Sequence, residues 1–304
     1  MPLCVFPKCF LPQLCEQRSM SVEQLLDVLA GVDLDGVEFY WPFLPQDSDG
    51  RTDKKALHRY RELAERQGRR IPMLCYSPDF TKLDRADRQR EVSSQTKAID
   101  AAAELGATYC RVLSGQARPG VAREQGIWWV VECIQQAIEH AARRGIVLVM
   151  ENHYKDGYWQ YPEFAMPMGI YLEILDRIEP SAHFGVNFDP SNAVIAGEDP
   201  LVFLQAVKDR VRTLHASERY LKGGTLADLR AMERDPHKGY AQILEHGAPG
   251  RGFIDYEGIF AILREIGFDG WISIEDGSDP KTGLADIAES AAFLRGMMNR
   301  YDIA

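Results

Sequence analysis

Four polar residues stand at the ends of short apolar runs, and all four are of types that bind metal ions. Glu151 follows GIVLVM, Asp189 follows HFGVNF, His215 follows VRTL and Glu275 follows WISI. Three carboxylates brought to one place would repel each other and lose hydration unless a cation held them. The pattern therefore predicts a divalent metal site, provided that the four runs are neighbouring parallel strands.

The rest of the chain supplies such strands, because strand-like and helix-like segments alternate from end to end. The strand-like runs are LCVFPKCF, DGVEFYW, IPMLCYS, TYCRVLSG, GIVLVMENH, FGVNFDPSN, VRTLHASER and WISIEDG. Segments with apolar residues at i, i+3 and i+4 spacing follow them, at 21–31, 54–68, 87–106, 128–145, 167–178, 200–207, 256–267 and 283–298. Eight such pairs predict one α/β domain over residues 1–304, a (β/α)8 TIM barrel.

Two local features bear on this prediction. Gly68, Gly106, Gly145 and Gly267 each follow a predicted helix, where a left-handed backbone would end it. The competing fold, a doubly wound open sheet, usually carries a glycine-rich phosphate loop after its first strand, and FPKCFLPQ is not one. We therefore expect the closed barrel.

Composition limits the partners. A net charge of −10 argues against a nucleic-acid surface, and no apolar run approaches the length of a membrane span. The N-terminus lacks the basic start and long apolar stretch of a signal peptide, and none of the six cysteines forms a CxxC pair. We expect a cytoplasmic protein with reduced, structural cysteines that acts on a small molecule.

Two long connections would lie over the carboxyl-terminal mouth of such a barrel, where active sites of this fold lie. Residues 219–256 form the longer one, either as a lid or as a solvated excursion with a short helix. Residues 153–169 carry Tyr158, Trp159 and Tyr161, which could line a sugar site or simply pack within the loop.

In this barrel the four polar residues end strands five to eight, whose ends lie about 5 Å apart. One cation could then reach all four. Oxygen-rich ligation with one imidazole suits Mn²⁺ best, with Mg²⁺ or Co²⁺ as alternatives. Taken singly, each residue would more often be a helix N-cap or a salt-bridge partner. Asp189 in the run DPSN, for example, could merely cap the next helix.

Several segments together resemble a known family. They are DGVEFYW, VLVMENH, NFDPSNAVIAGEDP, RTLHASER and GRGFIDYEGIFAILREIGFDGWISIED. With them the chain resembles the xylose-isomerase-like TIM-barrel superfamily, which includes D-tagatose 3-epimerase, hydroxypyruvate isomerase and inosose dehydratase. The resemblance implies a metal site at Glu151, Asp189, His215 and Glu275. It also implies proton transfer by Glu151 and Glu275 through a metal-stabilised enediolate of a keto sugar, and often a homo-oligomer.

His153 leaves a second activity open. It lies two residues past Glu151, so in an extended strand both side chains would point the same way. C-glycoside deglycosidase catalytic subunits of this superfamily look similar in having a Glu-x-His pair here, and that likeness implies a lyase, with His153 as base and a small partner subunit. A dehydratase is the related alternative, and a merely orienting role for His153 is equally open. A non-catalytic sugar-binding barrel is the third hypothesis.

The remaining candidates are expected substrate contacts at the same mouth. Lys8 or Arg111 could bind hydroxyls or a carboxylate, while Glu38 could bind a hydroxyl or pair with Lys8. Asn192 stands where many epimerases have histidine. No glycine-rich loop or basic cluster follows strands seven and eight, which favours a non-phosphorylated sugar. The full expected set is Lys8, Glu38, Tyr76, Arg111, Asn192 and Arg219.

Overall fold

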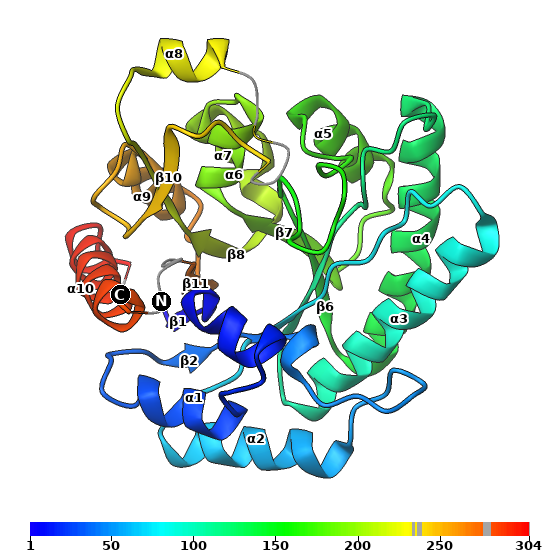
Figure 1. Cartoon of the computed structure of the whole chain (residues 1–304), viewed down its shortest axis with the longest axis horizontal. Helices are drawn as coiled ribbons and strands as arrows, with labels where there is room; N and C mark the ends of the chain where they lie inside the picture. Colours follow the sequence, from blue (N-terminus) through cyan, green and yellow to red (C-terminus); the bar gives the residue numbers. More distant parts are fainter. Residues whose placement is uncertain (233–234, 236–238, 276–280, 304) are drawn as a thin grey trace.

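The computed structural model describes residues 1–232, 235, 239–275 and 281–303, and its core is a parallel sheet (Figure 1). The strands run in the order β2-β1-β11-β8-β7-β6-β5-β4-β3, and every neighbouring pair is parallel. Their bounds are Leu3–Val5 (β1), Gly36–Val37 (β2), Phe39–Tyr40 (β3), Met73–Cys75 (β4), Tyr109–Val112 (β5), Val147–Glu151 (β6), Phe184–Phe188 (β7), Val211–Ala216 (β8) and Trp271–Ile274 (β11).

The sheet closes through Glu38. β2 pairs with β1 and β3 pairs with β4, and only Glu38 separates β2 from β3 along the chain. Among the described residues, the nine strand segments therefore form eight staves of one barrel. This confirms the predicted single-domain (β/α)8 fold and excludes the open doubly wound sheet.

Helices surround the barrel (Figure 1). Those that follow the staves are Val22–Leu29 (α1), Lys54–Arg66 (α2), Arg85–Glu104 (α3), Arg123–Arg144 (α4), Met168–Arg177 (α5), Pro200–Val207 (α7), Tyr256–Glu265 (α9) and Gly283–Arg300 (α10). The four glycines predicted to end helices have φ values of 71°, 75°, 69° and 60°, which confirms their left-handed conformation. Short helical turns not expected from the sequence are Lys8–Phe10 (η1), Pro12–Glu16 (η2), Trp41–Phe43 (η3), Pro190–Ala196 (α6) and Lys208–Arg210 (η4).

The connection over residues 219–256 is more ordered than the sequence indicated. It contains an antiparallel hairpin of β9 (Glu218–Leu221) and β10 (Leu244–Gly247), and the short helix α8 (Leu226–Ala231). The helix was one expectation for this segment, but the hairpin was not, because its strands are short and mostly polar. Within the described residues, the helices include none that is both long enough and apolar enough to span a membrane.

Tyr171 joins α5 to the stave that carries Glu151. Its buried hydroxyl donates a 2.7 Å hydrogen bond to the carbonyl oxygen of Met150, the residue before Glu151. Replacing Tyr171 by Phe should lower the free energy of unfolding by about 1 kcal/mol, because a buried hydrogen bond is lost. Urea unfolding checks this, with the exposed Tyr158→Phe as the matched control. Equal midpoints for both variants and the unaltered protein would contradict the role of this bond.

Candidate metal centre

Four adjacent staves bring the predicted ligands together. Glu151 is the last residue of β6, Asp189 follows β7, His215 lies within β8 and Glu275 follows β11. The staves are neighbours in the order β6-β7-β8-β11. One potential ligand atom from each residue lies within 4.8 Å of the others, and all four residues are buried. The small difference from the prediction is that Glu151 and His215 lie inside their strands.

The electrostatics of this cluster fit a bound cation. Burial and the negative charges of Glu275 and Glu151 raise the pKa of Asp189 to about 6. The buried Oε2 of Glu275 lies 2.9 Å from His215 Nδ1 but has no donor in hydrogen-bond geometry among the described residues. A divalent cation among these atoms would relieve the repulsion and supply the missing partner. The residues present therefore fit the metal that the sequence predicted.

Asp189 is held in place by neighbours that the sequence reading missed. The side-chain amide of Asn152 donates to the Asp189 carbonyl at 2.7 Å and accepts from the Asp189 N–H at 2.8 Å. Ser217 Oγ donates to Asp189 Oδ1 at 2.6 Å. In the sequence these residues stand out only by position. Asn152 directly follows Glu151, and Ser217 lies two residues after His215.

Asp189 also caps a helix, as the simpler explanation proposed, but the helix is α6, which precedes the one expected at 200–207. Its Oδ1 accepts a 3.0 Å hydrogen bond from the backbone N–H of Asn192. The cap and the Ser217 bond both use Oδ1, so the second carboxylate oxygen can still bind a ligand. Capping and metal binding are therefore compatible in the same residue.

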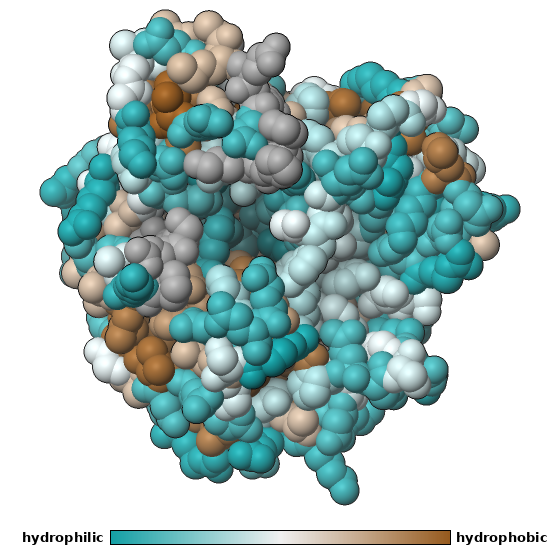
Figure 2. Space-filling view, viewed as in Figure 1, coloured by the Kyte–Doolittle hydropathy of each residue, from teal (hydrophilic) through white to brown (hydrophobic). Residues whose placement is uncertain are grey.

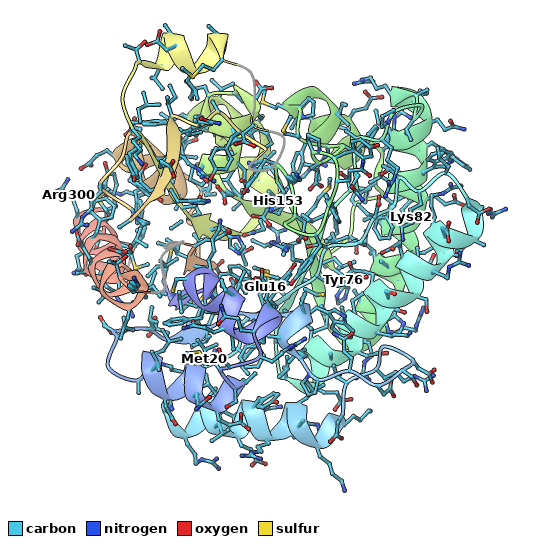
Figure 3. The ribbon with its side chains drawn as sticks, viewed as in Figure 1. Glu16, Met20, Tyr76, Lys82, His153 and Arg300 are labelled. Atoms are coloured by element: carbon cyan, nitrogen blue, oxygen red, sulfur yellow. The ribbon has the colours of Figure 1, made fainter. Side chains whose placement is uncertain are left out.

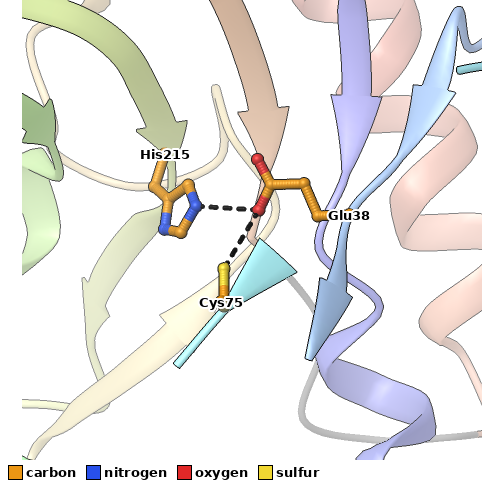
Figure 4. A group of neighbouring side chains, drawn as sticks. All are labelled: Glu38, Cys75 and His215. Carbon is orange, nitrogen blue, oxygen red and sulfur yellow. Dashed lines mark hydrogen bonds and ion pairs between the residues drawn. The ribbon is translucent and has the colours of Figure 1, made fainter. Parts of the chain in front are cut away.

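Glu38 orients His215 from the other side (Figure 4). Its Oε2 lies 3.0 Å from His215 Nε2, while His215 Nδ1 lies 3.1 Å from Glu151 Oε1. A carboxylate on the far nitrogen is the usual partner of a metal-binding histidine and directs the other nitrogen to the ion. Although burial opposes it, the negative charges of Glu38 and Glu151 raise the pKa of His215 well above its ordinary value.

Of the two roles expected of Glu38, the pairing with Lys8 is not what the structure shows. Its two oxygens also accept from the thiols of Cys4 (3.7 Å) and Cys75 (3.6 Å), and the residue is fully buried. Glu38 therefore lies against His215 and two thiols instead of pairing with Lys8. The six cysteines are all free of disulfide bonds.

Glu38, Cys75 and His215 form a second group close enough to hold an ion (Figure 4). Burial raises the pKa of the Cys75 thiol to about 12, and the charge of Glu38 acts in the same direction, although Arg111 opposes it. Metal binding to cysteine requires the thiolate. The carboxylate-rich group at the strand ends is therefore the better candidate.

Two cations pair with the two glutamates of the cluster. Arg111 Nη1 donates to Glu151 Oε2 at 2.8 Å, and its Nη2 donates to Ser77 Oγ at 2.9 Å. Lys8 Nζ donates to Glu275 Oε1 at 2.8 Å. Although burial opposes it, Lys8 and His215 hold the pKa of Glu275 well below its usual range, and His215 and Arg111 lower that of Glu151. Each glutamate is therefore paired with a cation that favours its charged form.

His153 lies just outside the assigned strand, but its side chain is near Glu151, whose negative charge raises the pKa of His153 although burial opposes it. β6 ends at Glu151, and His153 belongs to the following loop. Its ring stacks on Tyr154 with centroids 5.4 Å apart, and its Nδ1 lies 3.5 Å from Glu163 Oε2. The sequence analysis did not single out Glu163. Its side chain also accepts hydrogen bonds from the N–H and the hydroxyl of Ser114.

The other predicted contacts are distributed around this centre. Asn192 Nδ2 donates to Glu151 Oε1 at 3.4 Å, whereas the hydroxyl of Tyr76 donates to Glu91 on α3 at 3.4 Å. Of the loop aromatics, Tyr158 is exposed, while Trp159 and Tyr161 are half-buried. Arg219 lies fully buried on β9. In the view of Figure 2 the surface is hollowed near its middle, where hydrophilic residues gather. Figure 3, drawn from the same side, places His153 near the middle of that view.

The fold agrees with comparison to known proteins. A family model described as Xylose isomerase-like TIM barrel matches residues 26–297, and the chain belongs to that family. An inosose dehydratase of Lacticaseibacillus casei is 33% identical over 100 residues, which cover 31% of this chain and 30% of that protein. The chain thus spans about a third of the length of this curated relative.

Solved structures extend the similarity of fold over the whole chain. A D-tagatose 3-epimerase-like protein has a TM-score of 0.76 at 19% identity, covering 99% of this chain and 98% of that one. An IolI protein with a bound zinc atom has a TM-score of 0.71 at 15% identity, with the same coverage.

Exchanging single ligands should separate the two possible metal groups. Asp189→Asn should weaken Mn²⁺ binding by more than the roughly 10- to 100-fold typical of losing an outer partner, and asparagine still caps α6. Cys75→Ser should bind Mn²⁺ as the unaltered protein does. Competition with a chromogenic chelator measures both constants. The opposite result, with Cys75→Ser weakened and Asp189→Asn unchanged, would move the ion to the group around Glu38.

Proposed function

We propose that this chain is a divalent-metal-dependent isomerase or epimerase of a keto sugar or a related polyol ketone. The observation that supports it most is the placement of two buried, ionised glutamates in one ligand cluster. Glu151 and Glu275 come from the two outer strands of the row β6-β7-β8-β11. A substrate held between them could meet a carboxylate on each of its faces.

The chemistry follows from this placement. A bound divalent cation would polarise the substrate carbonyl and stabilise the negative charge that develops on its oxygen. Glu151 would remove the proton from the neighbouring carbon, and Glu275, after taking a proton from solvent, would deliver it to the opposite face. Arg111 and Lys8 keep the two carboxylates ionised and fix their direction, through bonds of 2.8 Å each. We propose Mn²⁺ as the ion, since oxygen-rich ligation suits it, with Mg²⁺ or Co²⁺ as alternatives.

A lyase acting through the same centre is the second candidate. The similarity to inosose dehydratase over a third of the chain favours it. So does His153, whose Nδ1 faces a buried carboxylate at 3.5 Å and which could serve as a base in an elimination. His153 could act as the base in a dehydratase and equally in a deglycosidase of 3-keto C-glycosides.

Removing either glutamate's charge should stop turnover while leaving the fold intact. Glu151→Gln and Glu275→Gln should each lower kcat by roughly 10²- to 10⁴-fold, because each removes a proton-transferring group. Deuterium exchange into D-fructose measures the rate, and metal analysis of each variant reports whether the ion remains. Glu16→Gln, an exposed glutamate of η2, is the matched control and should keep full activity (Figure 3). Near-normal rates in both cluster variants would contradict the mechanism.

Incubation with keto sugars in D₂O separates the two candidate reactions. An isomerase or epimerase should place deuterium on carbon with no loss of atoms, since the proton returned comes from solvent. A lyase should release water or an aglycone and leave an unsaturated product. Mass spectrometry distinguishes the outcomes, and a product lighter by one water would favour the dehydratase.

A further inference from the structure

Arg219 is a fully buried cation whose guanidinium forms no hydrogen bond with the residues that the structure describes. Its relative exposure is 0%, and its Nε, Nη1 and Nη2 atoms form no hydrogen bond within the structure as described. Its Cζ lies 4.7 Å from the ring centre of Tyr240 and 5.8 Å from that of Tyr154. Aromatic faces stabilise the charge in part but use none of its N–H groups. A guanidinium buried in this way is costly unless something else pairs with it.

His246 stands directly opposite Arg219 on the hairpin. The two residues are register partners of β9 and β10, so their side chains project from the same face. His246 Nε2 lies 3.0 Å from Lys8 Nζ, whereas its buried Nδ1 has no partner among the described residues. Burial, helped by the charges of Arg219 and Lys8, lowers the pKa of His246 well below its ordinary value. Both register partners therefore present unused polar atoms.

This face of the hairpin is connected to the metal centre. Lys8 Nζ bonds Glu275 at 2.8 Å and His246 at 3.0 Å. Contacts thus run from the ligand Glu275 through Lys8 to His246, with Arg219 beside it in the register. A molecule bound at the cluster could extend to the hairpin through this side of the mouth.

The nearest carboxylate in sequence cannot serve Arg219. Glu218 precedes it on β9, so its side chain points to the opposite face. Its oxygens accept from the backbone N–H groups of Arg219 (3.0 Å), Gly250 (3.1 Å) and Ile254 (2.9 Å). Glu218 thereby ties the hairpin to the segment that follows it, and the guanidinium of Arg219 is left for a ligand.

We propose that Arg219 and His246 form a subsite for an oxyanion of the substrate, a carboxylate or a phosphate. This rests on the proposed function and narrows its substrate class to acidic keto sugars. A guanidinium presents parallel N–H groups that match two oxygens of such an anion, and His246 Nδ1 supplies a third contact. Tyr154 and Tyr240 keep water from the site, which strengthens the pairing. The reacting carbonyl end would then lie at the ligand cluster.

The test compares three ligands of the Mn²⁺-loaded protein by calorimetry: D-fructose, D-fructuronate and D-fructose 6-phosphate. At least one acidic ligand should bind roughly tenfold or more tightly than fructose, as expected for a desolvated charged pair. Arg219→Met should abolish that advantage, and Arg219→Lys should reduce it, because lysine keeps the charge but not the paired geometry. Lys222→Met, which removes an exposed cation just after β9, should leave it unchanged.

The pattern of binding identifies the anion, since only a carboxylate site would prefer fructuronate and only a phosphate site the phosphate ester. Equal affinity for all three ligands, or an acidic preference that survives in Arg219→Met, would overturn the subsite. Deuterium exchange into each of the three ligands by the unaltered protein reports the reaction separately. Exchange without acidic preference contradicts only the subsite, and acidic preference without exchange contradicts only the proposed reaction.

Discussion

Mutual repulsion among buried carboxylates governs this end of the barrel. Glu151, Asp189 and Glu275 bring ligand atoms within 4.8 Å of one another, and the raised pKa of Asp189 reports the repulsion that results. Arg111 and Lys8 offset part of it by pairing with the outer two carboxylates. In the described structure neither cation contacts Asp189. The Oδ1 atom of Asp189 accepts hydrogen bonds from neutral donors only. A divalent ion among these residues would balance the charge that is left.

The fold holds these charges together against that repulsion. Parallel register places β6, β7, β8 and β11 side by side, so that backbone hydrogen bonds set the spacing of the ligands. Asn152 then joins one ligand strand to the next by its paired bonds to Asp189, and Glu38 fixes the ring of His215. Arg219 on the hairpin adds a further charge, because it is buried and its guanidinium forms no hydrogen bond with the described residues.

The sequence was informative where local pattern determines structure. Alternating segments predicted the barrel, and polar residues at strand ends predicted the ligand set at Glu151, Asp189, His215 and Glu275. It failed where the partner lies far away in the chain: Glu38 orients a histidine on another stave, and His246 reaches Lys8 from the hairpin. The sequence also did not show that His153 lies in the loop after β6, beside Glu163. Arg219 was expected as a substrate contact, but only the three-dimensional structure shows that its guanidinium forms no hydrogen bond with the described residues.

Anomalous X-ray scattering from crystals of the Mn²⁺-loaded protein tests the central claim most directly, because it locates the ion independently of activity. We predict one strong manganese peak bounded by Glu151, Asp189, His215 and Glu275, with Nδ1 of His215 facing it. The peak should vanish after treatment with EDTA and return on reloading. No peak at these residues in fully loaded crystals, or a peak between Glu38 and Cys75, would contradict the account.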